Sequence, residues 1–278
     1  MRLTDKSLAV VLSAEAILDS VAVTDPGQTR ASNEDSVVIA VSAENPERGT
    51  LLLLADGLGG HNAGEVASRM VTADLPECYF HRSGRNYLDD LVRSVSEVNS
   101  LVHSAGREEG ERRGMCTTLV SALIVNQYLV FLNVGDSRGY LIRNQQMVHR
   151  TKDHSLRGNG GAAQHQRNRP VMSHVLTQAI GPHPTVFPDI TIRRIVAGDL
   201  ILLSSDGLTD VATDEEIVEI ALSARVSEAA PRLIELAKRN GSNDNISVVL
   251  SQVVQVPDSS SFQIHMNDLD RYLVVDPR

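Results

Sequence analysis

The segment Leu51–His61, LLLLADGLGGH, constrains the fold more than any other part of this sequence. Its apolar run leads into one carboxylate, Asp56, and then into a cluster of glycines. A short apolar run bounded by turn residues is typical of a strand that is buried on both faces. An aspartate at the end of such a strand is held by a rigid element, and the glycines let backbone oxygens approach a ligand closely. Carboxylate and backbone oxygens together suit hard divalent cations, although a single turn of this kind is more often only a turn.

The same arrangement recurs along the chain. The apolar run Asp199–Leu203, for example, leads through two serines into an Asp-Gly pair, and Ile246–Leu250 directly follows an Asp-Asn pair. The acidic residues placed at the ends of apolar runs are Glu34, Asp35, Asp56, Asp136, Asp206 and Asp244. Each of them alone could be an ordinary turn or helix-cap carboxylate. Because this arrangement of an apolar run and an acidic residue is repeated, we predict that folding gathers these acids into one shared site.

Length and charge limit the class of protein. A chain of 278 residues with 42% apolar residues can bury a sizeable core, and it shows neither internal repeats nor a linker before residue 257. The net charge of −9, without any basic run, argues against a nucleic-acid partner. Converging acids would repel one another, so part of the negative charge is expected to be compensated by metal ions.

Cysteine content and hydropathy exclude further classes. Cys78 and Cys116 are the only cysteines and lack the spacing of a zinc site, so neither a disulfide scaffold nor a zinc protein is predicted. The N-terminal apolar segment Leu8–Ala14 is short and is soon followed by acidic residues, which is not typical of a signal peptide. No apolar run reaches the roughly 18 residues that a membrane span requires. We therefore expect a cytoplasmic protein with no membrane partner.

The order of predicted elements indicates an α+β fold. Apolar residues at three- and four-residue steps predict an amphipathic helix over Tyr87–Arg113, and the alternating segments from Thr117 to Arg150 predict an antiparallel meander. Strands and helices come in blocks rather than in βαβ alternation, so antiparallel sheets covered by helices are expected. We predict an N-terminal extension (1–16), one domain (17–256) and a polar tail (257–278). The long polar segment 153–184 is expected to be functional or disordered.

Oxygen-rich acidic sites of this kind can hydrolyse phosphate esters. Two divalent ions about 4 Å apart can clamp a phosphate and activate a water molecule, so no covalent enzyme intermediate is needed. Carboxylate and carbonyl ligands without cysteine favour Mg²⁺ or Mn²⁺ over zinc. Arg30, four residues before Glu34, is placed to bind a phosphate bidentately.

The motifs that carry these residues resemble those of the PP2C (PPM) family of metal-dependent protein Ser/Thr phosphatases, in particular its bacterial branch. In family order they are Arg30-x-x-Asn33-Glu34-Asp35, Asp56-Gly57-x-Gly59-Gly60-His61, Gly114-x-x-Thr117-Thr118, Gly135-Asp136-Ser137-Arg138, Asp153-His154-Ser155-Leu156, Ser205-Asp206-Gly207-Leu208 and Asp244-Asn245. The match runs from about Val21 to Leu250. The resemblance implies a β-sandwich of two antiparallel sheets flanked by helices, with two Mn²⁺ or Mg²⁺ ions at one end.

The resemblance also implies a role for each matching residue. Asp56 would bridge the two ions, and Gly57 would offer its carbonyl oxygen to one of them. The remaining implied roles are Asp206 and Asp244 as ligands of the first ion, Glu34 or Asp35 as a ligand of the second, Asp136 with Asp206 as ligands of a third, Arg30 as the phosphate-binding residue, and Asp56, Asp206 and Arg30 as the catalytic set. Asn245 could support these ligands without binding the ions itself.

Two positions depart from the family pattern. Animal members carry a histidine, proposed as the general acid, where this chain has Leu58; bacterial relatives also have an apolar residue there. The nearby His61 could act as an acid or a supporting residue, or it could be a plain loop residue, and water at the metal centre could protonate the leaving group instead. In the segment that matches the family's flap, 157–169 reads RGNGGAAQHQRNR where relatives usually carry a short acidic helix. Its arginines could favour acidic phosphopeptides or form a solvated loop.

The implied activity is hydrolysis of phosphoserine and phosphothreonine in proteins, in opposition to a Hanks-type Ser/Thr kinase. Two alternatives use the same fold: a binding protein without catalysis, which would usually lack some metal ligands, and a phosphatase of a partner-switching system, which often lacks the Arg30 motif. This chain retains both features. The protein is expected to act as a monomer on phosphorylated proteins.

Overall fold

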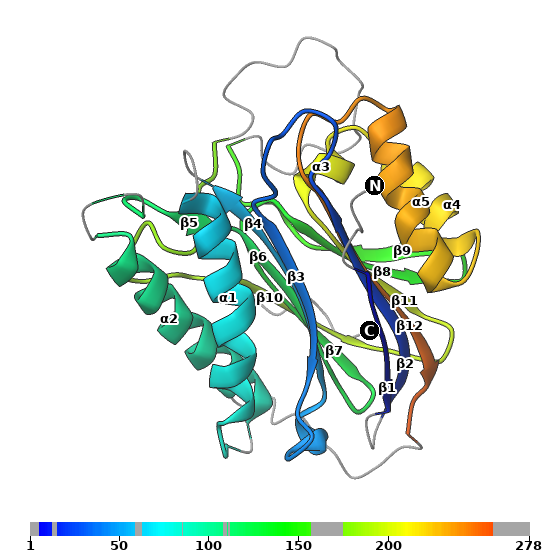
Figure 1. Cartoon of the computed structure of the whole chain (residues 1–278). Helices are drawn as coiled ribbons and strands as arrows, with labels where there is room; N and C mark the ends of the chain where they lie inside the picture. Colours follow the sequence, from blue (N-terminus) through cyan, green and yellow to red (C-terminus); the bar gives the residue numbers. More distant parts are fainter. Residues whose placement is uncertain are drawn as a thin grey trace.

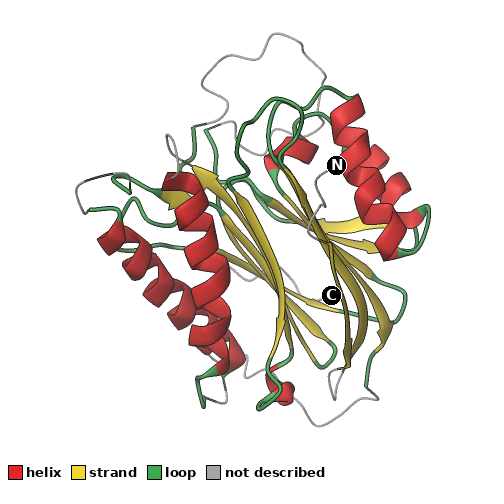
Figure 2. Ribbon diagram, in the orientation of Figure 1, coloured by secondary structure: helices red, strands yellow, loops and turns green. Residues whose placement is uncertain are grey.

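The computed structural model describes residues 6–12, 16–58, 63–84, 86–107, 110, 112–156 and 175–257. Two antiparallel sheets pack face to face in this part of the chain, and helices cover the outer face of each, as Figures 1 and 2 show. The first sheet has the order β1-β2-β12-β11-β8-β9 and the second β10-β7-β6-β4-β3, with β5 paired to β4. The predicted α+β sandwich is thus what the chain adopts.

The strands are short to medium in length, and each pairs antiparallel with its neighbours. Their bounds are β1 Lys6–Leu12, β2 Ile17–Asp25, β3 Asp35–Val41, β4 Thr50–Leu58, β5 Cys116–Thr117, β6 Leu119–Val125, β7 Tyr128–Val134, β8 Arg138–Arg143, β9 Gln146–Arg150, β10 Asp189–Arg194, β11 Leu200–Ser204 and β12 Ile246–Gln255. The helices are η1 Pro46–Arg48, α1 Ala63–Phe80, α2 Tyr87–Ala105, α3 Asp206–Thr209, α4 Asp214–Leu222 and α5 Val226–Arg239.

Alternate residues of the central strands pack into different cores, which explains why these strands read as continuous apolar runs. In β4, Leu51 and Leu53 face helices α1 and α2, whereas Leu52 and Leu54 face the opposite sheet. β11 behaves in the same way, with Leu202 toward α4 and α5 and Leu203 between the sheets. The four-layer arrangement therefore buries both faces of both sheets.

Three local predictions differ from the structure. Part of the predicted extension forms β1, which pairs with β2 at the edge of the first sheet. The helix predicted to reach Arg113 ends at Ala105, because Gly106 and the charged residues after it offer no apolar face to pack. The predicted meander is wrong as a single sheet: β6 and β7 belong to one sheet, and β8 and β9 to the other. None of the described helices is both long and apolar enough to cross a membrane.

The crossing between the sheets occurs at Gly135–Ser137. Gly135 has φ of 114°, a backbone conformation that favours glycine, and a Cβ there would lie 2.7 Å from Thr118. The Oγ atoms of Thr118 and Ser137 are 2.7 Å apart and buried, which fixes this turn against the start of β6. The turn therefore carries Asp136 to the end of the sandwich, where the chain passes from one sheet to the other.

Candidate active site

Asp35 and Asp56 lie side by side at one end of the second sheet. They are direct partners in the register of β3 and β4. Side chains alternate along a strand, so Asp56 shares a face with Leu52 and Leu54, which pack between the sheets. Two carboxylates are therefore placed next to each other at the edge of the inter-sheet core.

The first sheet contributes Asp206 and Asp244 to the same end. Asp206 begins α3, separated from the end of β11 by Ser205, and Asp244 shortly precedes β12. Ser205, also after β11, donates a hydrogen bond from Oγ to Asp35 Oδ2 at 2.9 Å and accepts one from the Ser247 backbone N–H at 3.0 Å. This buried serine joins the two sheets at the point where their acidic residues meet.

Burial and mutual repulsion raise the pKa values of these acids. Desolvation is the largest cause of the raised pKa of Asp56, followed by the charges of Asp35, Asp206, Asp136 and Asp244. The pKa of Asp206 is raised by desolvation first and then by other carboxylates. Burial raises the pKa of Asp35 to about 6, opposed by hydrogen bonds from Ser247 and Ser205. The pKa of Asp56 is thus raised by several neighbouring carboxylates at once, in addition to burial.

Asp136 brings in two acids that were assigned no role from the sequence. Burial raises its pKa to about 6, with further contributions from Asp153 and Asp210 that raise it and from Arg138 that lowers it. Arg138 itself binds Asp153 through two hydrogen bonds, at 2.9 and 2.7 Å. Asp153 belongs to a quoted motif and could have been selected from it. No motif in the sequence marks Asp210. It lies near Asp206 because the short helix α3 begins at Asp206 and is capped by Asp210.

The donor set suits a divalent cation. Asp35 Oδ1 and Asp206 Oδ1 are buried without any hydrogen-bond partner, which is costly unless a cation satisfies them. Among the described residues, no three acidic, histidine or cysteine side chains close around one point as a complete metal cage. Mg²⁺ commonly takes one or two carboxylates and completes its shell with water, so the oxygens present fit such an ion.

Glycines allow β4 and α1 to meet closely beside Asp56. A Cβ on Gly57 would lie 2.2 Å from the carbonyl oxygen of Gly64, so only glycine fits at this position. The Gly57 N–H donates to the Glu34 carbonyl at 3.1 Å, and Ser68 Oγ donates to the same oxygen at 2.6 Å. Glu34 is therefore fixed through its backbone, while burial raises the pKa of its carboxyl group.

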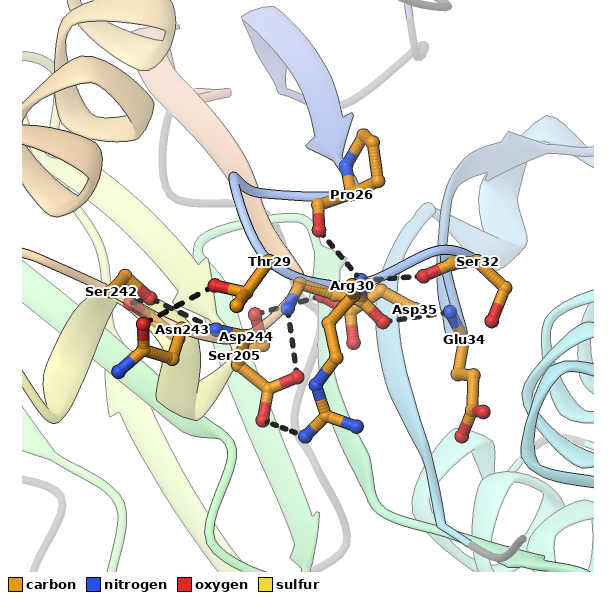
Figure 3. Close-up of polar contacts among 12 residues, drawn as sticks. Pro26, Thr29, Arg30, Ser32, Glu34, Asp35, Ser205, Ser242, Asn243 and Asp244 are labelled. Carbon is orange, nitrogen blue, oxygen red and sulfur yellow. Dashed lines mark hydrogen bonds and ion pairs between the residues drawn. The ribbon is translucent and has the colours of Figure 1, made fainter. Parts of the chain in front are cut away.

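Arg30 is in contact with one of the acids. Its guanidinium donates a hydrogen bond to Asp244 Oδ2 at 2.7 Å, as Figure 3 shows. The side chains are 53% and 38% exposed, so this ion pair stabilises the fold little and separates easily. Arg30 can thus exchange its carboxylate partner for an oxyanion of a ligand.

Comparison with known proteins identifies the family. The model of the protein phosphatase 2C family matches residues 28–250. This chain belongs to the protein phosphatase 2C family. It is 38% identical over 242 residues to the serine/threonine protein phosphatase PstP of Mycobacterium tuberculosis, covering 86% of this chain and 45% of that protein. It is 35% identical over 237 residues to the serine/threonine phosphatase stp of Listeria innocua, covering 82% and 92%.

Solved structures agree with this assignment. The crystal structure of the PstP catalytic domain in complex with two manganese ions has a TM-score of 0.72 and 40% identity, covering 86% of this chain and 99% of that one. The resemblance predicted from the motifs is confirmed, and so is the fold. The chain nevertheless spans about half the length (45%) of the M. tuberculosis PstP sequence.

The protein phosphatase 2C motifs converge as the sequence predicts. The structure brings together Asp35, Asp56, Asp136, Asp206 and Asp244, with Arg30 beside Asp244. Leu58 ends β4 opposite Cys116, which leaves no imidazole at that position. His61 falls outside the described residues, as do 157–174 of the predicted flap. Of that flap, Ser155 and Leu176 form an isolated bridge.

Proposed function

We propose that this chain is a metal-dependent protein Ser/Thr phosphatase. The observation that carries the proposal is the convergence of Asp56 and Asp206, whose raised pKa values have burial as their largest cause and whose strongest charged neighbours are other carboxylates. Such a concentration of buried acids is expected to bind cations. Membership of the protein phosphatase 2C family and similarity to the serine/threonine phosphatases PstP and stp support phosphoprotein hydrolysis as the activity.

We assign the metal-binding roles as follows. Asp56 would lie between the two ions, with the Gly57 carbonyl oxygen as a further ligand of one of them. Asp206 and Asp244 would bind the first ion, and Glu34 or Asp35 the second. Asp136, together with Asp206, would serve a third. Bound Mn²⁺ or Mg²⁺ would supply Lewis acidity toward the phosphoryl group and lower the pKa of water. The relative that contains two manganese ions supports this number of ions.

Arg30 is the residue that would bind and orient the substrate phosphate. Its exposure and its weak ion pair leave the guanidinium accessible, and a bidentate grip would hold the phosphate against the carboxylate cluster. Leu58 cannot transfer a proton, so no side chain at that position protonates the leaving group. Arg30, Asp56 and Asp206 would together form the catalytic set.

The expected partners are phosphorylated proteins. We propose a Ser/Thr kinase of the Hanks type as the opposing enzyme, a monomeric state and a cytoplasmic location, in line with the sequence prediction. A panel of candidate phosphoproteins, including the activation loop of such a kinase, would separate this role from that of a partner-switching phosphatase.

The decisive experiment is hydrolysis of p-nitrophenyl phosphate and of a phosphothreonine peptide with Mn²⁺, with EDTA, and with Mn²⁺ restored after EDTA. We expect activity that EDTA abolishes and Mn²⁺ returns. Calorimetric titration with Mn²⁺ accompanies the assay. A folded protein that neither binds Mn²⁺ nor hydrolyses either substrate would refute the proposal and favour a binding protein without catalysis.

A further inference from the structure

Asn245 has a buried side chain whose amide nitrogen and oxygen both form hydrogen bonds. Only 5% of the residue is exposed. Its Nδ2 donates to the Pro26 carbonyl at 3.0 Å and to the Ser32 carbonyl at 2.9 Å, and its Oδ1 accepts from the Glu34 N–H at 2.8 Å. One side chain thus holds three backbone groups of a single loop.

The loop that Asn245 holds connects β2 to β3 and has no regular structure of its own. It carries Arg30 near its middle and Glu34 at its end, so both residues depend on how the loop is fixed. A second close contact lies at its start, where a Cβ on Gly27 would be 2.2 Å from the carbonyl oxygen of Asp244. The loop is therefore fixed against the same short segment that contains Asp244 and Asn245.

The opposite side of Asn245 contacts the turn that carries Asp206. A Cβ on Gly207 would lie 1.9 Å from the Asn245 carbonyl oxygen, so the two backbones are in direct contact. Ser242 Oγ also donates to the Gly207 carbonyl at 2.7 Å. Asn245 consequently lies between the Asp206 turn and the Arg30 loop, and it directly follows Asp244.

We propose that Asn245 is a positioning residue for the reaction: it sets the distance of Arg30 and Glu34 from Asp206 and Asp244. The inference rests on the proposed phosphatase function. The site needs two donors and one acceptor on a short side chain, and it needs them without charge, because a carboxylate would face two carbonyl oxygens and add to the acidic cluster. Asparagine alone among the short side chains meets both conditions.

The test uses Asn245→Ala and the milder Asn245→Ser, each assayed with p-nitrophenyl phosphate and titrated with Mn²⁺ by calorimetry. Because Arg30 would already bind the phosphate in the substrate complex, its displacement should raise KM more than it lowers kcat. We expect the KM of Asn245→Ala to rise about tenfold, equivalent to about 1.4 kcal/mol. The Kd for Mn²⁺ should rise several-fold through Glu34, and Asn245→Ser should lie in between.

Two controls separate positioning from a general loss of stability. Asn99 is also buried and also holds a loop, donating to the His183 carbonyl and accepting from the Gly181 N–H. Asn243 flanks Asp244 on its other side, but its side chain makes an exposed hydrogen bond with Thr29. Asn99→Ala should lower the melting temperature without changing the Kd for Mn²⁺, and Asn243→Ala should change neither by much.

The outcomes distinguish the two proposals. Wild-type protein that shows no Mn²⁺-dependent hydrolysis would refute the phosphatase function, whereas the calorimetric comparison would still report on Asn245. Active wild-type protein with an Asn245→Ala variant whose KM and Mn²⁺ affinity stay within about twofold would overturn the positioning role. Should neither variant fold, amide hydrogen exchange in the wild type decides: a Glu34 amide that exchanges as fast as an open loop would also overturn it.

Discussion

One aspartate flanks each end of β11, and the two carboxylates differ in whether the protein supplies partners for their charge. Asp199, directly before the strand, is fully buried and accepts hydrogen bonds at 2.7 Å from both Nε and Nη2 of Arg143 and at 2.9 Å from the Val196 N–H. Asp206, two residues after the last residue of the strand, has Oδ1 buried without a partner and a pKa raised by burial and by other carboxylates. The five residues of β11 and Ser205 separate a carboxylate with hydrogen-bond partners from one with an unpartnered oxygen.

A second compensated pair supports this contrast at the far end of the second sheet. Arg48 is buried, binds Asp90 at 3.0 Å, and lies 4.4 Å from the ring centroid of Tyr79. There the protein supplies its own cation for a buried carboxylate. At the acidic end it supplies mainly further carboxylates, so the balancing charge has to come from outside the chain. The ion-paired carboxylates therefore maintain the fold, whereas the uncompensated carboxylates are placed to bind a cation.

The largest effect is expected for Asp206→Asn. Loss of this carboxylate should lower Mn²⁺-dependent hydrolysis of p-nitrophenyl phosphate by roughly 10³-fold. The reason is that Asp206 would help to hold the cation that stabilises the developing charge of the transition state. The metal-free variant should nevertheless unfold at higher urea concentration than metal-free wild type, since a repelled carboxylate has been removed. A fully active Asp206→Asn protein would contradict the assignment.

Mn²⁺ should stabilise the acidic end by an amount that depends on its concentration. At 100 times the dissociation constant, binding to the folded state alone adds about 2.7 kcal/mol to the free energy of unfolding. Thermal unfolding with EDTA and with increasing Mn²⁺ measures this shift. The matched control is Asp206→Asn, in which the shift should be much smaller. Equal shifts in both proteins would place the ion elsewhere.

Asp199→Asn is the same substitution at the other end of β11, and its effect should have the opposite character. Removing one partner of a buried ion pair typically costs 3–5 kcal/mol. Because the Arg143 side chain is 32% exposed and can turn to solvent, we expect a loss of about 2 kcal/mol in the free energy of unfolding. KM and kcat should stay close to wild type. Urea unfolding and the phosphatase assay together check both statements, and a large loss of activity without loss of stability would break the comparison.

The sequence was sufficient to predict most of the acids that meet, because these stand at the ends of apolar runs. Strand ends lie at the edges of sheets, and the repeated position of Asp56, Asp136 and Asp206 in this pattern indicates a common edge. The same pattern could not distinguish Asp199 from Asp206, since both flank the same apolar run. Only the fold brings Arg143 to the former.

Sheet membership was harder to predict than strand position. Short antiparallel strands joined by tight turns look alike whether they stay in one sheet or change sheets, so the crossing at Gly135–Ser137 was missed. Asn245 was selected only through its motif, since three hydrogen bonds to a loop more than 200 residues away leave no local signal. Asp210 was missed for the same reason, because its neighbour Asp136 is close only in space.

The last effect concerns the pH dependence of stability, and Asp35 allows it to be tested. Burial raises its pKa from 3.8 to about 6 in the folded protein. Between these values the folded state binds more protons than the unfolded state, so the stabilising effect of protonation is complete below pH 3.8 and is lost as the pH rises through about 6. Metal-free wild type should therefore lose roughly 1 kcal/mol per pH unit more than Asp35→Asn over this interval. Urea unfolding in EDTA at successive pH values measures the difference. Saturating Mn²⁺ should reduce it, because a bound cation favours the ionised carboxylate, and identical slopes for the two metal-free proteins would show that Asp35 is not among the uncompensated acids.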